Sequence, residues 1–369
     1  MKQILPAAAG LALLLAAGAC DSFSNRGTVE RPEVMIATCT FTGVEKVELT
    51  DSSTVLHFVA RYRPNWWIQI DSGSCIEADG KSYPMISADG IPLGEHYFMP
   101  DSGVVHFSLT YPAIPSDVRA IDYIGRENDG NIYGIWLGGD YDPDAHLAAI
   151  PKKLRKQYTE TVLPEPNLAL DSATVNIHLV GYRPEMGDKL KYYYNGISGQ
   201  VSYCPDLTVD SCGNAVWKGR ILGPVEIFVM SLGDTPLNGQ AYVSPSESID
   251  LYVDMSYSGI FNTLVLDNNS FDNVPKRRYS YSDGIYGQLS AAAASASQYP
   301  YYSFNIYMGE FCDYGVSEQE YVDHIISRFE ALSDSIDAAD MPELNKALAR
   351  KSLEADLIDA AADARKVLV

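Results

Sequence analysis

Cysteine is the side chain with the clearest chemical potential in this sequence, and its spacing limits what it can do. The chain holds six cysteines, at positions 20, 39, 75, 204, 212 and 312. No two of them form a C-x-x-C pair, which disulfide oxidoreductases use for electron transfer and many zinc sites use for ligation. The sequence therefore predicts neither a thiol redox centre nor a zinc site among these residues.

Cys20 follows a run with the features of an export signal. Lys2 gives a short positive start, residues 4–19 are largely apolar, and small residues stand directly before the cysteine. The run is too short for a comfortable membrane span, which takes ~20 apolar residues, but it suits a signal peptide with a small-residue cleavage site. A cysteine at this place resembles a bacterial lipobox, so we expect a lipid on Cys20 that anchors the protein to the membrane. The alternative is an ordinary cleaved signal followed by a chance cysteine.

An exported chain enters an oxidising compartment, where disulfides form. Cys39 and Cys75 could join two strands of one domain, and Cys204 and Cys212 could bracket a hairpin. Cys312 is then left over, either as a thiol or as a link between chains. Spacing alone does not determine connectivity, so both pairs are hypotheses.

Other sequence motifs of catalysis and metal binding are absent or incomplete in this sequence. There is no G-x-S-x-G elbow, no H-E-x-x-H and no phosphate-binding glycine loop. His57 and His106 lack a second ligand at metal spacing, and the acidic run 140–144 lacks the glycine and the final glutamate of a calcium loop. We therefore expect no metal, no cofactor and no catalytic residue, although a glycosidase-type pair among the 48 acids stays open.

Two aromatic pairs are the candidate binding residues. Exposed Trp rings bind sugars or peptides, which makes Trp66 and Trp67 a candidate platform. Neighbouring strand residues point to opposite faces, however, so we expect one of the two in the core or at a strand edge and the other at the surface. Tyr301 and Tyr302 lie in a Tyr-rich stretch that suits a recognition patch, because Tyr offers amphipathic contact area at little entropic cost. A loop packed on a β-sandwich is the alternative.

The charge and composition narrow the classes of partner. The formal net charge is −21, and removal of the signal would make it more negative by the single charge of Lys2. Nucleic acid and anionic lipid surfaces both require clusters of Lys and Arg, so we expect no nucleic-acid partner and an anchor made by the lipid alone. The apolar content of 46% is that of a globular protein with a real core.

The hydrophobic period predicts a mainly β protein: two antiparallel β-sandwich domains in tandem, followed by a C-terminal α-helical hairpin. Runs such as 55–60, 104–109 and 173–179 alternate between apolar and polar residues, with turn signals between them. From Ser317 the period becomes helical, behind the capping box of Ser317 and Glu320. The expected segments are a signal peptide (1–19), a flexible tether (20–35), a first sandwich (36–147), a linker (148–170), a second sandwich (171–256), a Tyr-rich extension (257–315) and the hairpin (316–369).

Several runs in the first domain resemble one family of envelope lipoproteins. They are VELTDSSTVLHF (47–58), RPNWWI (63–68), ADGKSYP (78–84), FMPDSG (98–103), IDYI (121–124) and YGIW (133–136). In this order they resemble the TlpA-like thiol-disulfide oxidoreductases of gut anaerobes, whose members carry β-rich domains ahead of a thioredoxin fold with W-C-x-x-C. The first cysteine of that motif attacks a substrate disulfide as a thiolate.

The W-C-x-x-C motif is absent here, so no catalytic residue carries over from the family. The resemblance implies a non-catalytic accessory or scaffold portion of an enzyme for cell redox homeostasis, located in the cell envelope at the outer membrane and facing the periplasm or the surface. This portion is either a truncated member or a member that never had the enzyme. The alternative function is a surface lipoprotein that binds glycan or peptide through aromatic sandwich faces. A protein partner or a second copy of the chain is expected in either case.

Overall fold

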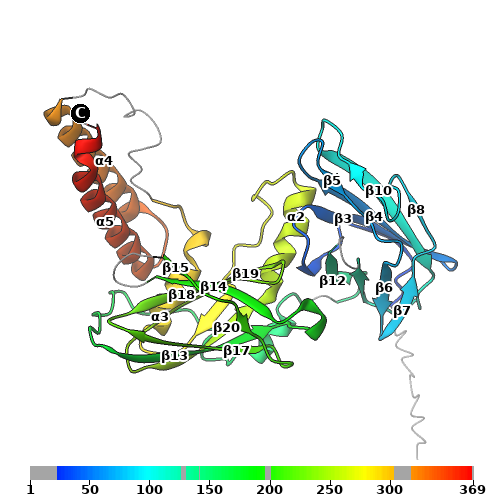
Figure 1. Ribbon diagram of the computed structural model, residues 1–369, viewed down its shortest axis with the longest axis horizontal. Coiled ribbons are helices and arrows are strands. Elements are labelled where there is room, and N and C mark those ends of the chain that lie inside the picture. Colours follow the sequence, from blue (N-terminus) through cyan, green and yellow to red (C-terminus); the bar gives the residue numbers. More distant parts are fainter. Residues whose placement is uncertain (1–22, 126–129, 141, 196–200, 303–316, 368–369) are drawn as a thin grey trace, which may run out of the picture.

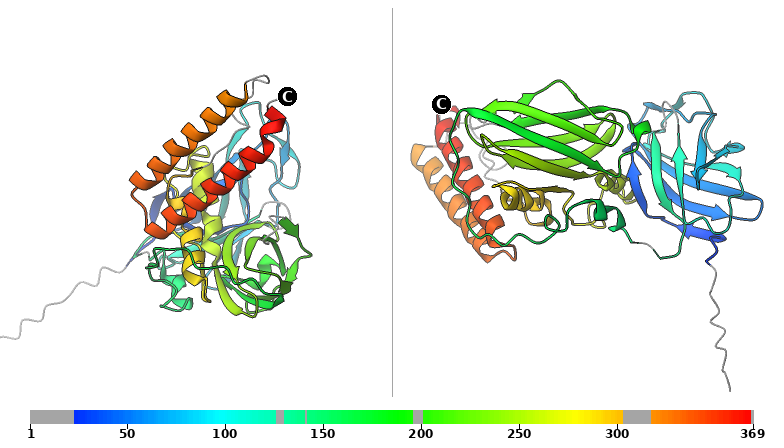
Figure 2. Two further views of the ribbon diagram at one scale, coloured as in Figure 1. Left: turned by 90° about the vertical axis from the view of Figure 1, so that its left-hand side faces the viewer. Right: turned by 90° about the horizontal axis from the view of Figure 1, so that it is seen from below.

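The computed structural model describes residues 23–125, 130–140, 142–195, 201–302 and 317–367. Two β-sandwiches lie end to end, and a helical hairpin stands at the far end of the second (Figures 1 and 2). This arrangement confirms the predicted fold class. Cys20 and Cys312 lie outside the described residues, so their expected roles stay predictions. Among the described helices, none combines the length and the apolar character needed to cross a bilayer.

The first sandwich packs two five-stranded sheets around one core. The first sheet runs in the order β1 (Gly27–Glu30), β3 (Thr42–Leu49), β4 (Ser53–Arg61), β10 (Val104–Pro112) and β8 (Ser87–Asp89). The second runs β2 (Val34–Ala37), β12 (Asn131–Trp136), β11 (Ala120–Ile124), β6 (Cys75–Ala78) and β7 (Lys81–Pro84). In β4 and β10 the inward residues are those that the alternation predicts, and Phe58 stacks on Phe107 at 5.2 Å between ring centroids.

The prediction of a flexible tether over residues 20–35 is wrong from Gly27 onward. β1 pairs with β3, and β2 pairs with β12, so residues 27–37 belong to both sheets of the first sandwich. Further upstream, the Asn25 side chain is buried and donates to the carbonyl oxygens of Pro115 and Val118. The small polar residues of this stretch suggested flexibility, but the sheets supply the backbone partners that order it.

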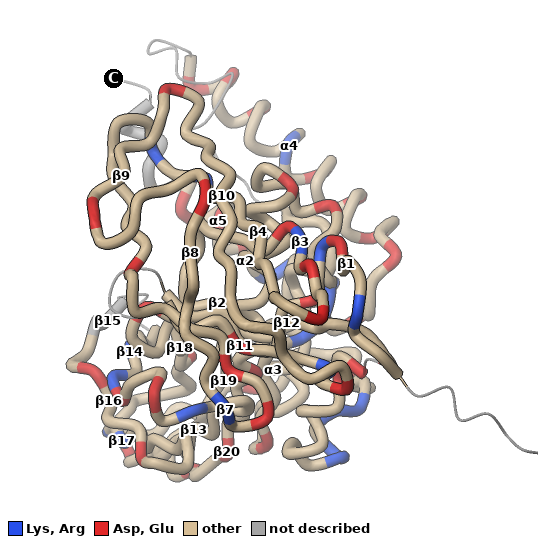
Figure 3. The backbone as a smooth tube through the Cα atoms, turned by 90° about the vertical axis from the view of Figure 1, so that its right-hand side faces the viewer, with Lys and Arg blue, Asp and Glu red and all other residues tan. Residues whose placement is uncertain are grey.

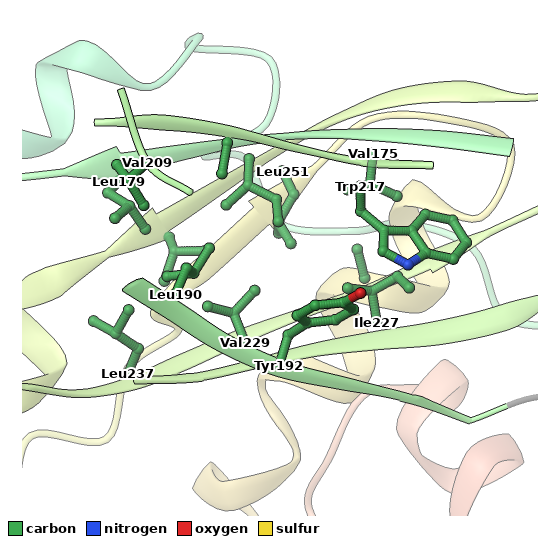
Figure 4. Packing of buried hydrophobic residues seen from close by; sticks show 14 of the residues in the cluster. Val175, Leu179, Leu190, Tyr192, Val209, Trp217, Ile227, Val229, Leu237 and Leu251 are labelled. Atoms are coloured by element: carbon green, nitrogen blue, oxygen red, sulfur yellow. The ribbon is translucent and has the colours of Figure 1, made fainter. Parts of the chain in front are cut away.

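The second sandwich has a four-stranded sheet facing a sheet built on β14. The first consists of β17 (Asn214–Ile221), β13 (Asp171–Val180), β20 (Ser248–Asp254) and β21 (Ser280–Ser282), and β13 and β20 run parallel. The second consists of β15 (Val201–Tyr203), β14 (Lys189–Asn195), β18 (Val225–Leu232) and β19 (Thr235–Val243), with β16 (Leu207–Thr208) also on β14. Trp217 and Tyr192 fill the core between the sheets (Figure 4). Because β21 completes a sheet, the second domain extends beyond the predicted boundary at residue 256.

The hairpin of α4 (Glu318–Ala338) and α5 (Glu343–Val367) confirms the predicted helical pair. Ser317 caps α4 in the predicted box, since its side chain accepts from the Glu320 amide and the Glu320 side chain accepts from the Ser317 amide. The hairpin docks through Asn345 of α5, whose side chain donates to the Ala292 carbonyl of α3 (Gly287–Ala294) and accepts from the Tyr158 hydroxyl. Residues of the linker and of α3 therefore hold the hairpin on the second sandwich.

A short helical element joins the two sandwiches. It consists of η3 (Met255–Gly259) and α2 (Ile260–Leu266), and it leaves the end of β20 to pack on β2 and β3 of the first domain (Figure 1). Within it, the buried Asn262 side chain accepts from the Val44 amide at 2.8 Å, and the Ser258 hydroxyl accepts from the Ala37 amide at 3.3 Å. Backbone donors of the first domain thus depend on side chains of the second.

Apolar and charged contacts add to the interface between the two sandwiches. Ile36 and Tyr133 of the first sandwich belong to the hydrophobic core cluster of the second. Arg183, from the second sandwich, donates to Asp122 of the first at 2.5 Å and lies over the Tyr133 ring. Burial raises the pKa of the Tyr133 hydroxyl to about 12, so this ring stays neutral at physiological pH. The interface is therefore part of the core, unlike the polar and mobile contacts common between domains.

Gly259 gives a direct test of the joint. A Cβ atom there would clash with the Val34 carbonyl oxygen and lie 2.6 Å from that of Met35, both of them backbone atoms. We expect Gly259→Ala to lower the free energy of unfolding by about 1–3 kcal/mol, as overpacking of a close contact does. Urea denaturation would measure it.

Gly73→Ala is the matched control, because its new Cβ would meet only the movable Asp71 carboxylate. Equal stability losses in both variants would contradict the close packing at Gly259.

Candidate binding surfaces

The exposed aromatic platform consists of Trp66, Trp67, His96 and Phe98 on the first sandwich. It is built on the short pair of β5 (Trp67–Ile68) and β9 (Tyr97–Phe98), in which Trp67 lies directly opposite Phe98. Trp66, Trp67 and Phe98 are 52%, 43% and 64% exposed, which is high for such large side chains. Contiguous exposed apolar area of this kind marks an interaction site more often than it marks an ordinary surface.

Neighbouring groups hold the two indole rings. The His96 ring stacks on Trp67 at 3.8 Å between centroids, and the Arg63 guanidinium lies 5.0 Å from the centre of the Trp66 ring. Tyr62 meets Trp66 edge to face at 6.0 Å. These contacts restrict the rotamers of both rings, so that less side-chain conformational entropy would be lost when a ligand binds.

Neither of the two Trp residues lies in the core, since both are exposed, and Trp67 lies on a strand of the small two-stranded sheet. β5 is only two residues long, and Trp66 precedes it in a turn where Asn65 has a φ of 62°. Strand alternation does not apply across such a turn, so the buried position falls to Ile68 instead. His96 and Phe98 were not predicted as binding residues, and Phe98 is exposed whereas the next residue, Met99, is buried.

Tyr301 and Tyr302 border a pocket of about 290 Å³ between the second sandwich and the hairpin. Tyr301 is almost fully exposed, whereas Tyr302 is half-buried and donates to the Ser335 carbonyl of α4. Tyr242 and Asn345 form other parts of the wall. The two predicted tyrosines therefore lie in one place, on a different domain from the platform.

The expected bridge between Cys39 and Cys75 does not form in the structure. The register places Thr38, Asn131, Ile124 and Cys75 in one row across four strands of the second sheet. Two strands therefore separate the cysteines, about 14 Å at ~4.8 Å per strand, far above the ~4.4–6.8 Å between Cα atoms that a disulfide spans.

The expected bridge between Cys204 and Cys212 also does not form in the structure. Cys204 packs against the core of the second sandwich just after β15, whereas Cys212 is exposed in the turn before β17. The Asp210 carboxylate holds that turn by accepting from the amides of Cys212 and Asn214, which lowers the Asp210 pKa. Cys204 follows β15 and Cys212 precedes β17, and these strands belong to different sheets. No hairpin joins β15 directly to β17 in this described part of the chain.

A larger pocket of about 700 Å³ lies at the joint of the two domains, and no sequence motif indicates it. Arg277 donates to Asp144 at 2.5 Å and to the Ser256 hydroxyl, and it lies 3.5 Å from the buried Asp254 carboxylate. Burial opposes the charge of Arg277, but the interactions with Asp254, Tyr279 and Asp144 together outweigh it and raise the Arg277 pKa. His146 bonds the other side of the Asp254 carboxylate at 2.8 Å.

A second guanidinium borders the same pocket from the first domain. Arg31 donates to Asp267, and Asn273 donates to the other oxygen of that carboxylate at 2.8 Å. The bond from Asn273 and then the bond from Arg31 lower the Asp267 pKa, so this carboxylate is ionised at neutral pH. Both arginines are therefore held in place by acids.

The remaining charge is dispersed. In the view of Figure 3, Lys and Arg positions are interspersed with Asp and Glu along the backbone. Among the described residues, no group of three or more His, Cys, Asp and Glu side chains is placed to hold a metal ion.

Comparisons with known proteins give weak likenesses. No family model and no curated protein matches the sequence. A pullulanase type I from Bacillus subtilis str. 168 complexed with maltose matches at a TM-score of 0.19 and 6% identity, over 59% of this chain and 25% of that one. BcpA, the major pilin subunit of Bacillus cereus, gives 0.16 and 8%, over 55% and 64%. The Bacillus anthracis TIE protein gives 0.17 and 10%, over 60% and 48%. This chain spans less than two thirds of each of them, and likeness at this level carries no argument about function.

The exposure of the platform predicts a sharp contrast between tryptophans. We expect Trp66→Ala with Trp67→Ala to change the free energy of unfolding by less than about 1 kcal/mol, because both side chains are at the surface. Trp217, at 4% exposure, is the control, and Trp217→Ala should cost about 3–5 kcal/mol. Urea denaturation compares them, and a loss from the double variant as large as that from Trp217→Ala would mean that the platform is part of the core.

Proposed function

We propose that this protein is a non-catalytic lipoprotein of the cell envelope that serves as an accessory scaffold of the TlpA-like thiol-disulfide oxidoreductase type. The observation that carries the proposal is the joint around η3 and α2. A scaffold must hold its parts at constant separation, and here Asn262 and Ser258 bond backbone amides of the other domain in a buried interface.

The placement of the described thiols supports a non-catalytic role. Two strands separate Cys39 from Cys75. Cys204 follows β15 and Cys212 precedes β17, two strands that belong to different sheets. Dithiol exchange needs two sulfurs that can reach one another and an attacking thiolate with access to its substrate. Cys39 and Cys75 are buried, so they lack that access as well.

A second candidate function is favoured by the aromatic platform. Exposed Trp, Phe and Arg side chains that are already held by their neighbours are typical of binding hot spots. The second candidate function is therefore binding of a glycan or peptide through the platform. Such binding would give the scaffold a specific ligand in the cell envelope.

Two measurements test the scaffold proposal. We expect residues 21–369 to leave the rate of insulin reduction by dithiothreitol unchanged, and we expect the full chain in bacteria to incorporate labelled palmitate. Cys20→Ala is the control for labelling and should remove the label. Catalysed insulin turnover would overturn the non-catalytic role, and an unlabelled full chain would overturn the lipid anchor.

The platform can be tested on glycan and peptide arrays. We expect binding that falls at least about tenfold in the Trp66→Ala, Trp67→Ala double variant, because hot-spot aromatics each contribute about 2 kcal/mol or more. Ile86→Ala is the matched control, since Ile86 is also an exposed large apolar residue of this sandwich. Equal binding by the wild type and the double variant would remove the platform from consideration.

A further inference from the structure

The interdomain pocket has the size and location of a small-molecule site. Its volume of about 700 Å³ lies within the ~300–1,000 Å³ of ligand pockets, which occur preferentially at domain interfaces. One wall is the turn 31–35 of the first sandwich, and the other is formed by η3, α2 and residues 273–279. The same bonds that join the domains therefore shape the pocket before any ligand arrives.

The charges around the pocket are already paired within the protein. Arg277 is held by Asp144 and Asp254, and Arg31 is held by Asp267. An anionic ligand would have to compete with these carboxylates for the guanidinium groups. A cationic ligand would meet the guanidinium groups themselves, so neither sign of net charge is well matched.

The paired groups keep hydrogen-bonding capacity that suits hydroxyl groups. A guanidinium has five N–H donors and a carboxylate about four acceptor sites, more than the bond from Arg277 uses on the Asp144 carboxylate. Asp144 is 60% exposed in its side chain, and Glu33, Thr263 and Asn273 add further polar atoms along the walls. A hydroxyl both donates and accepts, so a polyhydroxylated ligand can use both kinds of site.

Apolar lining completes the match. Leu266 and Pro275 contribute accessible aliphatic surface, whereas Ile260 and Tyr279 border the pocket but are only 8% and 5% exposed. A sugar ring presents C–H groups on its faces and hydroxyls at its edge, which is the same combination.

We propose that the interdomain pocket binds a neutral saccharide of mono- to trisaccharide size. Arg277, Asp144 and Glu33 bond its hydroxyl groups, and the apolar wall contacts its ring face. The site is separate from the aromatic platform, and it stands whether or not the accessory role above is correct.

The test is isothermal titration calorimetry of residues 21–369 with defined probes at up to about 10 mM. The neutral probes are cellobiose, maltose, lactose and N,N′-diacetylchitobiose, and the charged probes are glucuronate and glucosamine. We expect at least one neutral disaccharide to bind more tightly than either charged sugar. Failure of all four neutral disaccharides to bind, or tighter binding of a charged probe, would overturn the proposal.

Variants locate the binding. Glu33→Ala removes an exposed acceptor, and Arg277→Lys keeps the charge but removes the forked donors, so each should weaken binding at least about tenfold. Glu77→Ala, an exposed acid on β6 outside the pocket, is the matched control and should leave affinity unchanged. Unaltered thermal midpoints for Glu33→Ala and Glu77→Ala exclude unfolding as the cause.

The platform variant separates the two sites. The Trp66→Ala, Trp67→Ala double variant should bind the neutral disaccharide as the wild type does. If it loses binding while Glu33→Ala and Arg277→Lys keep it, the saccharide binds to the platform and the pocket proposal is wrong.

Discussion

The hydrogen bond from the Val44 amide to the Asn262 side chain is the interaction on which the arrangement of this protein depends. It is buried, and it joins a strand of the first sandwich to a helix that belongs to the second. Loss of the side-chain partner would leave a backbone donor unsatisfied away from water, at a cost of about 1–3 kcal/mol. Because Gly259 must pass against the Val34 and Met35 carbonyls to bring Asn262 into place, packing and hydrogen bonding reinforce each other here. Neither domain is complete at this surface without the other.

Much of the fold was predictable because it follows from periodicity. Leu56, Phe58, Phe107 and Leu109 alternate with polar residues and are buried as expected, and the α4 stripe begins at the predicted capping box. The joint was not predictable, because Asn262 and Ser258 lie in a Tyr- and Ser-rich stretch with no period of its own. These side chains bond backbone amides that lie more than two hundred positions away in the sequence. Only the folded structure brings the partners together. The strand β21 escaped prediction for the same reason, since three residues carry too little pattern to indicate a sheet.

The candidate sites, too, were predictable only in part from the sequence. Trp66 and Trp67 could be chosen as binding residues from their type alone, but their exposure follows from a two-residue strand and a preceding turn that alternation does not describe. The predicted disulfide pairs do not form because sequence distance gives no information about sheet order. β12 and β11 lie between β2, which ends just before Cys39, and β6, which begins at Cys75. The interdomain pocket draws on residues 31–35, 143–144 and 256–279, and each of these is unremarkable in isolation.

Several acidic residues of this chain have a structural role at the joint between the sandwiches. The net charge of −21 argued against nucleic-acid and anionic-lipid partners, but composition does not say where the acids lie. Yet Asp122, Asp254 and Asp267 each bind an arginine at or beside the contact between the sandwiches, and Asp254 is completely buried. A buried carboxylate is tolerated only when it is paired and hydrogen-bonded, and Asp254 has both Arg277 and His146. These acids are therefore structural, and two of them, Asp254 and Asp267, orient the guanidinium groups that border the pocket. The residues that hold the domains together also determine which atoms a small molecule would meet between them.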